Sequence, residues 1–459
     1  MSRLVIVSNR VATPGESRAG GLAVALRAAL QEHAGGGMWF GWSGRSTRDD
    51  SGALHDETAD GIRYVTMDLS KRDLDQYYNG FANRTLWPLL HFRLDLVDYS
   101  RETREGYRRV NALFADRLAP LLRDDDIVWI HDYHLFPLGA LLRERGIGCR
   151  IGFFLHVPMP SADLVAAMPE HARLFSSLFA YDLVGFQTPR DVDRLAAYLR
   201  VYGGGKVLDD DVFEAPGGRR FRAAAFPISI DTARIARQAG EAISKPAVRE
   251  LRRSLEPRQL AIGVDRLDYS KGLPERFRGF ERYLERHPGE RGSLTYLQIA
   301  PVSRGEVTEY RALRNQLEQI AGSINGRFAE PEWTPLRYVN RNFSHATLTG
   351  FYRCARLGLV TPLRDGMNLV AKEYVAAQDP ADPGVLVLSL LAGAANELRE
   401  ALLVNPHDLD GVADAIATAA NMPRGKRIER WRAMMDVLET HDIGAWRRAY
   451  LAALAAPLP

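Results

Sequence analysis

The stretch TPLRDGMNLVAKEYVAAQDP (361–380) combines a chain-breaking Asp-Gly pair with a helical pattern that follows at once. Asp365 precedes the expected helix, Glu373 lies one turn into it, and residues 367–370 carry no charge. The first amides of a helix lack intrahelical partners and lie at the positive end of its dipole, so this helix start can accept a phosphate. Glu373 would then accept hydrogen bonds from a ribose on that phosphate. An ordinary turn capped by Asp365 is an equally open interpretation.

A second cationic stretch, VDRLDYSKGLPERF (264–277), ends an expected strand with Arg266 and adds Lys271 before a helix. Two fixed cations beyond a strand suit a diphosphate, because Arg binds phosphate oxygens as a fork and Lys supplies a point charge. The alternative is an internal ion pair of Arg266 with Asp265 or Asp268. Taken alone, this stretch favours the ion pair.

Two further arginines also follow expected strands. Arg10 comes directly after the first strand and indicates an anionic group nearby, and Arg304 precedes another helix in APVSRGEVTEY. Between the first strand and its helix lie Gly20 and Gly21, which let a ligand approach the backbone closely. These glycines do not form the GxGxxG fingerprint of dinucleotide-binding proteins.

The segment WIHDYHL (129–135) suggests a metal through His131, Asp132 and His134, but adjacent residues at a strand end point to opposite faces. Asp132 is better suited to accept hydrogen bonds from a polyol. His156 follows another buried strand in FFLHVPMP; a lone histidine is usually structural, yet this one belongs to the same set of residues after strands.

Tyr77, Tyr78 and Trp87 in DQYYNGFANRTLWPLLH form a candidate aromatic patch for stacking on a sugar ring, although aromatics are equally common in cores. The sequence contains no P-loop, nucleophile elbow or zinc motif. Cations, helix amides and scattered carboxylates without those motifs favour group transfer from a diphosphate leaving group, catalysed by positioning and electrostatic stabilisation.

The elements that must position these residues alternate between strands and helices. Near-continuous apolar runs predict strands buried on both faces of parallel sheets, and they occupy residues 4–8, 63–69, 127–132, 150–156, 183–188, 223–228, 260–266, 294–300, 357–362, 384–389 and 401–406. Helical patterns lie between them, for example at 109–122 and 273–287. The pattern predicts an α/β protein whose ligands bind at the carboxyl ends of the strands.

The series of strands is too long for one compact sheet, and the 459 residues suffice for two domains. We predict domains at 1–230 and 231–442, with a terminal helix at 443–459 that packs back on the first domain. The hinge is expected near 228–235.

Composition limits the classes of partner. The formal charge of +3, from 60 basic and 57 acidic residues, does not favour a nucleic-acid partner. The two cysteines, Cys149 and Cys354, are not in a paired spacing, which predicts neither a disulfide framework nor a zinc cluster and fits the cytoplasm. No apolar run of about 20 residues and no signal-peptide pattern are seen, so we expect no membrane partner.

Taken together, the motifs resemble the trehalose-6-phosphate synthase family, which consists of retaining glycosyltransferases of the GT-B fold. The resemblance covers nearly the whole chain in the family's order: LVIVSNR, AGGLAVAL, WFGWSG, DQYYNGFANRTLWP, DDDIVWIHDYHL, RIGFFLHVPMP, VDRLDYSKGLPERF, QIAPVSRGEV, INGRF, TPLRDGMNLVAKEYVAAQDP and GVLVLSLLAGAANEL. It implies two Rossmann-like, doubly wound domains that face a central cleft, the first binding the acceptor and the second the nucleotide sugar.

The resemblance also implies a role for each matching residue. The acceptor, glucose 6-phosphate, would be held by Arg10, Tyr78, Trp87, Asp132 and Arg304, with the two arginines on its phosphate. The donor would be held by Gly20, Gly21, Arg266, Lys271, Phe343, Asp365, Gly366, Met367, Asn368, Leu369, Val370, Ala371, Lys372 and Glu373. Catalysis would depend on Asp132, His156, Arg266, Lys271 and Asp365, of which His156 and Asp365 would contact the donor glucose.

The implied reaction transfers glucose from UDP-glucose to glucose 6-phosphate, without a metal or other cofactor, and yields α,α-trehalose 6-phosphate and UDP. A separate phosphatase would remove the phosphate, and a homo-oligomer, dimer or tetramer, is expected. Three alternatives stay open: a glucosylglycerol-phosphate synthase, a pseudo-glycosyltransferase acting on cyclitols, and a non-catalytic sugar-phosphate sensor. The sequence does not choose between UDP, ADP and GDP as the donor nucleotide.

Overall fold

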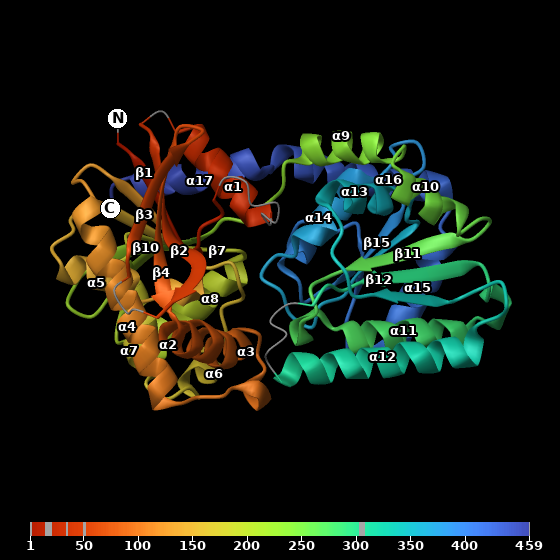
Figure 1. Cartoon of the computed structure of the whole chain (residues 1–459), viewed down its shortest axis with the longest axis horizontal. Coiled ribbons are helices and arrows are strands. Elements are labelled where there is room, and N and C mark those ends of the chain that lie inside the picture. Colours follow the sequence, from red (N-terminus) through yellow and green to blue (C-terminus); the bar gives the residue numbers. More distant parts are fainter. Residues whose placement is uncertain (1, 14–20, 34, 49–51, 303–307, 459) are drawn as a thin grey trace. The chain divides into compact units, whose positions relative to one another are not determined.

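The computed structural model describes residues 2–13, 21–33, 35–48, 52–302 and 308–458. They form two compact α/β units (Figure 1). The first unit comprises Met1–Pro227 together with Gly444–Pro459, and the second comprises Ile228–Ile443. The chain therefore leaves the first unit once and returns to it with its last helix.

Within its described residues, the first unit contains a ten-stranded sheet in the order β3-β4-β2-β1-β5-β6-β7-β10-β9-β8. The central strands pair in parallel, while β3 and the pair β8 and β9 run antiparallel at the two edges. The strands are Leu4–Arg10 (β1), Gly37–Thr47 (β2), Leu54–Ala59 (β3), Ile62–Ser70 (β4), Ile127–His131 (β5), Arg150–Phe154 (β6), Leu183–Phe186 (β7), Lys206–Val207 (β8), Val212–Glu214 (β9) and Arg220–Ala225 (β10).

The helices of the first unit cover this sheet. They are Gly21–Gln31 (α1), Lys71–Asp73 (α2), Trp87–Leu90 (α3), Arg101–Leu118 (α4), Leu138–Glu144 (α5), Ala162–Ala166 (α6), His171–Phe175 (α7), Pro189–Tyr198 (α8) and Ile443–Ala455 (α17). Between α2 and α3 the chain winds as a π-helix, Leu74–Leu86 (η1), a rare conformation that is frequent at functional sites.

Helix α17 packs on the centre of this sheet. The ring of Tyr450 stacks on Trp129 with centroids 4.4 Å apart, and its hydroxyl donates to the carbonyl of Phe153 at 3.0 Å. Glycines on β6 and β7 make room for the helix, because a Cβ at Gly152 or Gly185 would approach Tyr450 to 2.4 or 2.6 Å. The last helix is therefore part of the core of the first unit.

The second unit contains, among its described residues, a six-stranded parallel sheet in the order β13-β12-β11-β14-β15-β16. Its central strands are fully buried, as the continuous apolar runs predict. The strands are Gln259–Val264 (β11), Leu294–Ile299 (β12), Leu336–Val339 (β13), Leu357–Val360 (β14), Val385–Ser389 (β15) and Leu402–Val404 (β16).

Helices cover both faces of the second sheet (Figure 1). One face carries Leu273–Arg286 (α11), Thr308–Phe328 (α12) and Leu409–Ala420 (α15). The other carries Thr232–Ala242 (α9), Pro246–Arg253 (α10), His345–Cys354 (α13), Leu369–Ala377 (α14) and Arg424–Thr440 (α16). This is the doubly wound arrangement expected from the alternation of strands and helices.

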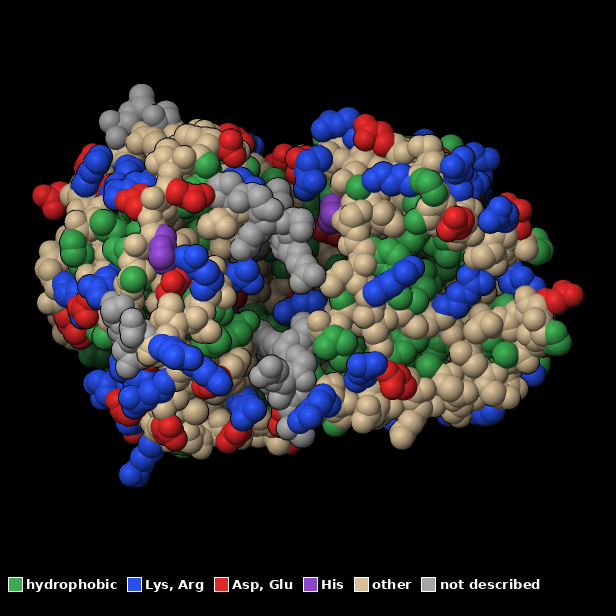
Figure 2. Space-filling model, viewed as in Figure 1, with side chains coloured by type: hydrophobic (Ala, Val, Ile, Leu, Met, Phe, Trp, Pro, Cys, Tyr) green, Lys and Arg blue, Asp and Glu red, His purple; other side chains and the backbone are tan. Residues whose placement is uncertain are grey.

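The predicted fold class is confirmed, and each of the eleven expected strands overlaps a strand of the structure. The described helices include none with the length and hydropathy needed to cross a bilayer. Figure 2 shows basic and acidic side chains interspersed over the visible face of each unit, in keeping with the small net charge.

Candidate active site

The carboxyl ends of β11 and β14 place Lys271 and Asp365 together in the second unit. Lys271 Nζ donates to Asp365 Oδ2 at 2.5 Å, and both side chains are largely buried. The same carboxylate oxygen accepts from Asn368 Nδ2 at 3.1 Å. A fixed cation, a carboxylate and an amide thus converge directly before helix α14.

The start of α14 is shaped as an anion site. Asn368 has φ of 75°, and its side chain caps the helix by accepting from the amide of Ala371 at 3.3 Å. The cap is therefore Asn368, and the alternative in which Asp365 caps the helix is wrong. The amides of Leu369 and Val370 precede the first i→i−4 bond of the helix, which leaves them oriented to bind an anion.

The loop between Asp365 and α14 is clamped against the neighbouring segment. Its backbone exchanges hydrogen bonds with Leu391 and Gly393 at 3.3 and 3.2 Å. A Cβ at Gly393 would lie 1.9 Å from the carbonyl oxygen of Gly366, so only glycine permits this approach. Met367 is buried, and its carbonyl accepts from the amide of Ala394 at 2.9 Å. The main chain next to the helix start is therefore held rigidly.

Two predicted residues of α14 point to different partners. Glu373 lies 3.4 Å from the ring of His345, which begins α13. The Lys372 side chain is fully buried and donates to Glu397 at 2.7 Å and to the carbonyl of Ile228 at 2.8 Å. The Lys372 ammonium is thus occupied by protein groups, and only its main chain remains for a ligand.

Arg266 lies beyond the end of β11 with about half of its side chain exposed. Its nearest carboxylate in the described chain is Asp268, at 4.0 Å, and not Asp265, which pairs with the buried Arg276 at 2.6 Å. Arg276 also donates to the carbonyl of Lys271 at 3.1 Å. A buried arginine therefore supports the loop that carries the two predicted phosphate-binding cations.

Phe343 follows β13 in the same unit. Its ring packs edge-on against Phe351 with centroids 5.3 Å apart, and the guanidinium of Arg341 lies 4.6 Å from its centroid. The side chain is only partly buried, which leaves part of the ring accessible.

In the first unit, Asp132 occupies a strained position at the carboxyl end of β5. Its φ of 75° and ψ of 164° lie in a region that residues other than glycine rarely adopt. Its amide donates to the carbonyl of Phe154 at 2.8 Å, and its carboxylate accepts from the amide of His156 at 3.3 Å. Strain of this kind at a strand end is typical of functional residues.

His156 is paired with a second histidine. His131 Nδ1 lies 3.0 Å from His156 Nε2, and the rings stack with centroids 5.3 Å apart. Burial lowers the pKa of His156 to about 3, and burial together with His156 lowers the pKa of His131 well below its usual value. Both imidazoles are therefore neutral at physiological pH, and His156 is suited to hydrogen bonding.

The predicted acceptor residues of the first unit differ in exposure. Arg10 is exposed at the end of β1 and lies over Gly44, where a Cβ would meet its guanidinium at 2.8 Å. Tyr78 is partly exposed and stacks on His134. Tyr77 and Trp87 are buried, which favours the core interpretation of these two rings, and among the three Tyr78 alone presents a substantial surface.

Two predicted site residues, Gly20 and Arg304, lie outside the described residues. Gly21 begins α1. Within the described ranges, no group of three or more His, Cys, Asp and Glu side chains is arranged to hold a metal ion.

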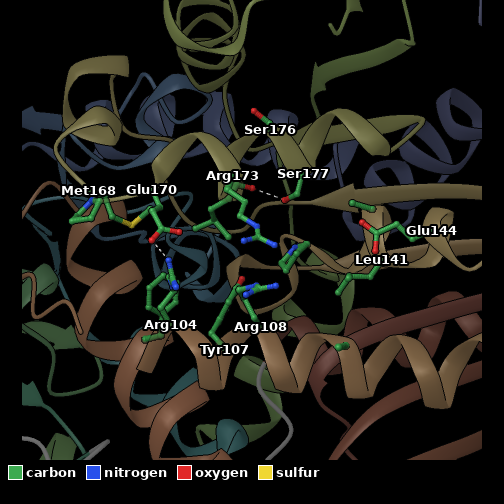
Figure 3. Close-up of a pocket in the computed structure, with 16 residues that line it drawn as sticks. Arg104, Tyr107, Arg108, Leu141, Glu144, Met168, Glu170, Arg173, Ser176 and Ser177 are labelled. Carbon is green, nitrogen blue, oxygen red and sulfur yellow. Dashed lines mark hydrogen bonds and ion pairs between the residues drawn. The ribbon is translucent and has the colours of Figure 1, made fainter. Parts of the chain in front are cut away.

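A pocket of about 390 Å³ lies elsewhere in the first unit, between α4, α5 and α7 (Figure 3). None of the predicted site residues lines it. Figure 3 shows Arg108 and Arg173 extending towards it from opposite sides, and Arg104 paired with Glu170. Arg108 is also paired, with Glu105 at 3.0 Å, so carboxylates already compensate much of this basic charge.

Comparison with known proteins identifies the family. Residues 5–456 match the model of glycosyltransferase family 20. The chain belongs to this family. It is 52% identical to a trehalose-6-phosphate synthase of Sinorhizobium fredii in an alignment of 460 positions that covers 99% of each chain.

Solved structures of family members match equally well. A UDP-forming α,α-trehalose-phosphate synthase from Burkholderia xenovorans, in complex with glucose-6-phosphate, superposes with a TM-score of 0.95 at 47% identity, covering 99% of this chain and 100% of that one. The Escherichia coli protein bound with UDP-2-fluoro glucose superposes with a TM-score of 0.95 at 48% identity over the whole of both chains. The predicted resemblance is thereby confirmed.

Sequence reasoning missed several residues of this glycosyltransferase family 20 chain. His131 was considered only as a metal ligand, Arg276 was part of a helical pattern, and neither His345 nor Gly44 was considered. Their partners are distant in the sequence: His131 is 25 positions from His156, Arg276 is 11 from Asp265, His345 is 28 from Glu373, and Gly44 is 34 from Arg10. The one signal available was that His131 and His156 each lie at the end of a buried strand. Recognising that the two side chains are neighbours required the pairing register of β5 and β6.

Proposed function

We propose that this chain transfers glucose from UDP-glucose to O1 of glucose 6-phosphate and releases α,α-trehalose 6-phosphate and UDP. The observation that carries the proposal is the junction before α14, where Lys271, Asp365 and the first helix amides converge. The full-length similarity to trehalose-6-phosphate synthases supports the choice of substrates.

The second unit holds the donor in this proposal. Arg266 and Lys271 bind the diphosphate together with the amides of Leu369 and Val370. Glu373 accepts hydrogen bonds from the ribose, and Phe343 lies beside the base. The capping of α14 by the neutral Asn368 supports this assignment, because it leaves the first turn without a competing carboxylate.

The first unit holds the acceptor. Arg10 binds the phosphate of glucose 6-phosphate, jointly with Arg304, and Tyr78 packs on the sugar ring. Asp132 orients the acceptor hydroxyl, and the neutral His156 donates or accepts a hydrogen bond at the donor glucose. The strained backbone of Asp132 supports this role, since such strain is retained where geometry matters for function.

The proposed reaction breaks one bond at C1 of the donor glucose and forms another. The bond from the glucose C1 to the UDP oxygen breaks, and a bond from C1 to O1 of the acceptor forms on the same face, which retains the anomeric configuration. The proton of the acceptor hydroxyl passes to the departing phosphate. Arg266, Lys271 and the helix amides stabilise the charge on that phosphate, in place of a metal ion.

We also propose that the enzyme works in the cytoplasm as a homo-oligomer. Its product carries a phosphate ester, so a separate phosphatase must release free trehalose.

The proposal is tested by a panel of nucleotide-glucoses against glucose 6-phosphate and glycerol 3-phosphate, with products identified by mass and anomeric NMR. We expect turnover with UDP-glucose and glucose 6-phosphate, and an α,α-linked product. A product formed only from glycerol 3-phosphate, or hydrolysis of the donor alone, would refute the proposed acceptor.

The leaving-group role is tested by Arg266→Ala, with the exposed Arg278→Ala on α11 as a matched loss of charge. Removing one electrostatic stabiliser of a transition state typically costs about 10²–10³ in turnover. We expect such a loss for Arg266→Ala at unchanged stability, and near-normal turnover for Arg278→Ala. Equal turnover of the two variants would remove Arg266 from the site.

A further inference from the structure

The second unit contains a polar pocket at the amino edge of its sheet, opposite to the candidate active site. It has a volume of about 340 Å³ and is lined by residues that precede β11 and β15 and by the ends of α10 and α13. Four arginines line it, namely Arg252, Arg258, Arg353 and Arg356. No residue of the proposed catalytic machinery belongs to it.

Two of these arginines are not engaged by protein groups. Within the described residues, the guanidinium groups of Arg252 and Arg258 have no hydrogen-bond or ion-pair partner, and Nε of Arg258 is buried. Arg353 and Arg356 are held in place, since Arg353 donates to the carbonyls at the end of α14 and Arg356 lies 3.3 Å from Asp382. The pocket thus combines two anchored cations with two available ones.

The acidic groups nearby do not balance this charge. Asp382 is shared, because it also pairs with Arg427 at 2.7 Å, and Glu256 is the second carboxylate of the lining. Asp379 lies outside the lining but is 3.4 Å from Arg353. The carboxyl-terminal ends of α10 and α13 contribute about −0.5 charge each. Counting Arg427 and Asp379, the pocket keeps a net positive charge of about +1.

The excess charge acts on a neighbouring residue. Burial and the like charge of Arg258 lower the pKa of Arg337, whose guanidinium donates to Ser254 beside the pocket. Clustered cations repel one another, and an anion bound among them would relieve that repulsion. A guanidinium fork matches phosphate oxygens in geometry as well as in charge.

We propose that this pocket is a second anion site, which binds a small phosphorylated molecule carrying at least two negative charges. The volume lies at the lower end for small-molecule sites, and the predominantly polar lining does not suit an apolar ligand or a stacked base. Helix α13 ends at this pocket and begins at His345, the partner of Glu373. Helix α13 therefore connects the pocket with His345, which contacts the proposed ribose-binding residue Glu373 on α14.

The test uses inorganic pyrophosphate as the probe and isothermal titration of the full chain at fixed ionic strength. Saturating UDP and glucose 6-phosphate occupy the proposed substrate sites, so that added pyrophosphate reports on the second site. We expect pyrophosphate to bind the wild type saturably, and its Kd to be at least tenfold higher for Arg252→Gln/Arg258→Gln. Turnover without pyrophosphate should be unchanged in this variant.

The matched control is Arg249→Gln/Arg253→Gln, which removes the same charge from α10 at exposed positions outside the pocket. Its Kd should stay within twofold of the wild type. Equal weakening in both variants, or no saturable binding to the wild type, would overturn the proposal. Arg252→Gln alone keeps the test valid if the double variant does not fold, since Arg252 is exposed and should give a partial loss.

Discussion

Lys271 Nζ and Asp365 Oδ2 form a 2.5 Å ion pair across two loops that follow neighbouring parallel strands, β11 and β14. In the proposed reaction the lysine charge is needed on the diphosphate and the carboxylate on the donor glucose. The ion pair keeps both groups in position before the donor binds. Each would then exchange a protein partner for a donor group without moving far.

The first prediction concerns this pair. Lys271→Ala should lower kcat/KM by about 10²–10³, because the variant lacks one of the cations that stabilise the leaving phosphate. Asp365→Asn should lower it less, since Lys271 remains. Steady-state kinetics with UDP-glucose measure both effects, and Lys426→Ala, an exposed lysine of the same unit, is the control. Lys271→Ala turnover within twofold of that control would contradict the assignment.

The second prediction concerns the strained backbone of Asp132. At φ of 75° glycine is unstrained, whereas alanine keeps the strain and also lacks the carboxylate. We expect Asp132→Gly to be more stable to urea than Asp132→Ala by about 1–2 kcal/mol. Both variants should lose most turnover. If the two variants unfold at the same urea concentration, the backbone is not strained in solution.

The third prediction concerns pH. His156 has a pKa of about 3 in the folded chain and about 6.5 when unfolded, so the unfolded state takes up the proton first as pH falls. Stability is therefore complete above pH 6.5 and declines as the pH falls towards 3, by at most about 1.4 kcal/mol per unit for this group. Urea unfolding at pH 7, 6 and 5 should show a shallower decline for His156→Gln.

His131 remains in that variant and retains part of the decline, because its pKa is also lowered. The exposed His407→Gln should keep the wild-type slope. An identical slope in His156→Gln and the wild type would show that His156 is not held neutral.

The fourth prediction concerns the buried Lys372. Lys372→Met leaves Glu397 and the carbonyl of Ile228 without their donor, and breaking a buried pair from one side typically costs about 3–5 kcal/mol. Lys372→Met/Glu397→Gln should recover part of that loss in urea unfolding. Arg314→Met, which breaks an exposed pair with Glu318, should leave the urea midpoint almost unchanged. Similar losses for Lys372→Met and Arg314→Met would argue against a buried pair.

Most buried strands of both sheets were predicted from a continuous apolar run, as in LVIVS and GVLVLS. Strand β2 was missed, although its first six residues are buried. Strand β3, LHDETA, was not predicted, because an exposed antiparallel edge strand has no such run. Strand β13 has only four residues, and its last three are only partly buried. The π-helical winding of η1 also has no pattern that periodicity could detect.

For the candidate site, residues directly after strands were predictable, because parallel strands bring their carboxyl ends to one edge. Side-chain direction was not. Lys372 and Glu373 are adjacent in the sequence, yet one is buried against Glu397 and the other lies beside His345. Likewise Tyr77 and Tyr78 differ in exposure because η1 turns one ring into the core.

The return of the chain to its first unit constrains how the protein can be made. Ile443 donates to the carbonyl of Ile230 at 3.0 Å, so the second unit begins and ends at nearly the same point, like an insertion into a surface loop. A ribosome needs roughly 10–40 s to synthesise that insertion. Throughout this time α17 does not yet cover the apolar surface around Gly152 and Gly185. The first unit of the nascent chain is therefore incomplete and can bind chaperones or aggregate until its final helix is made.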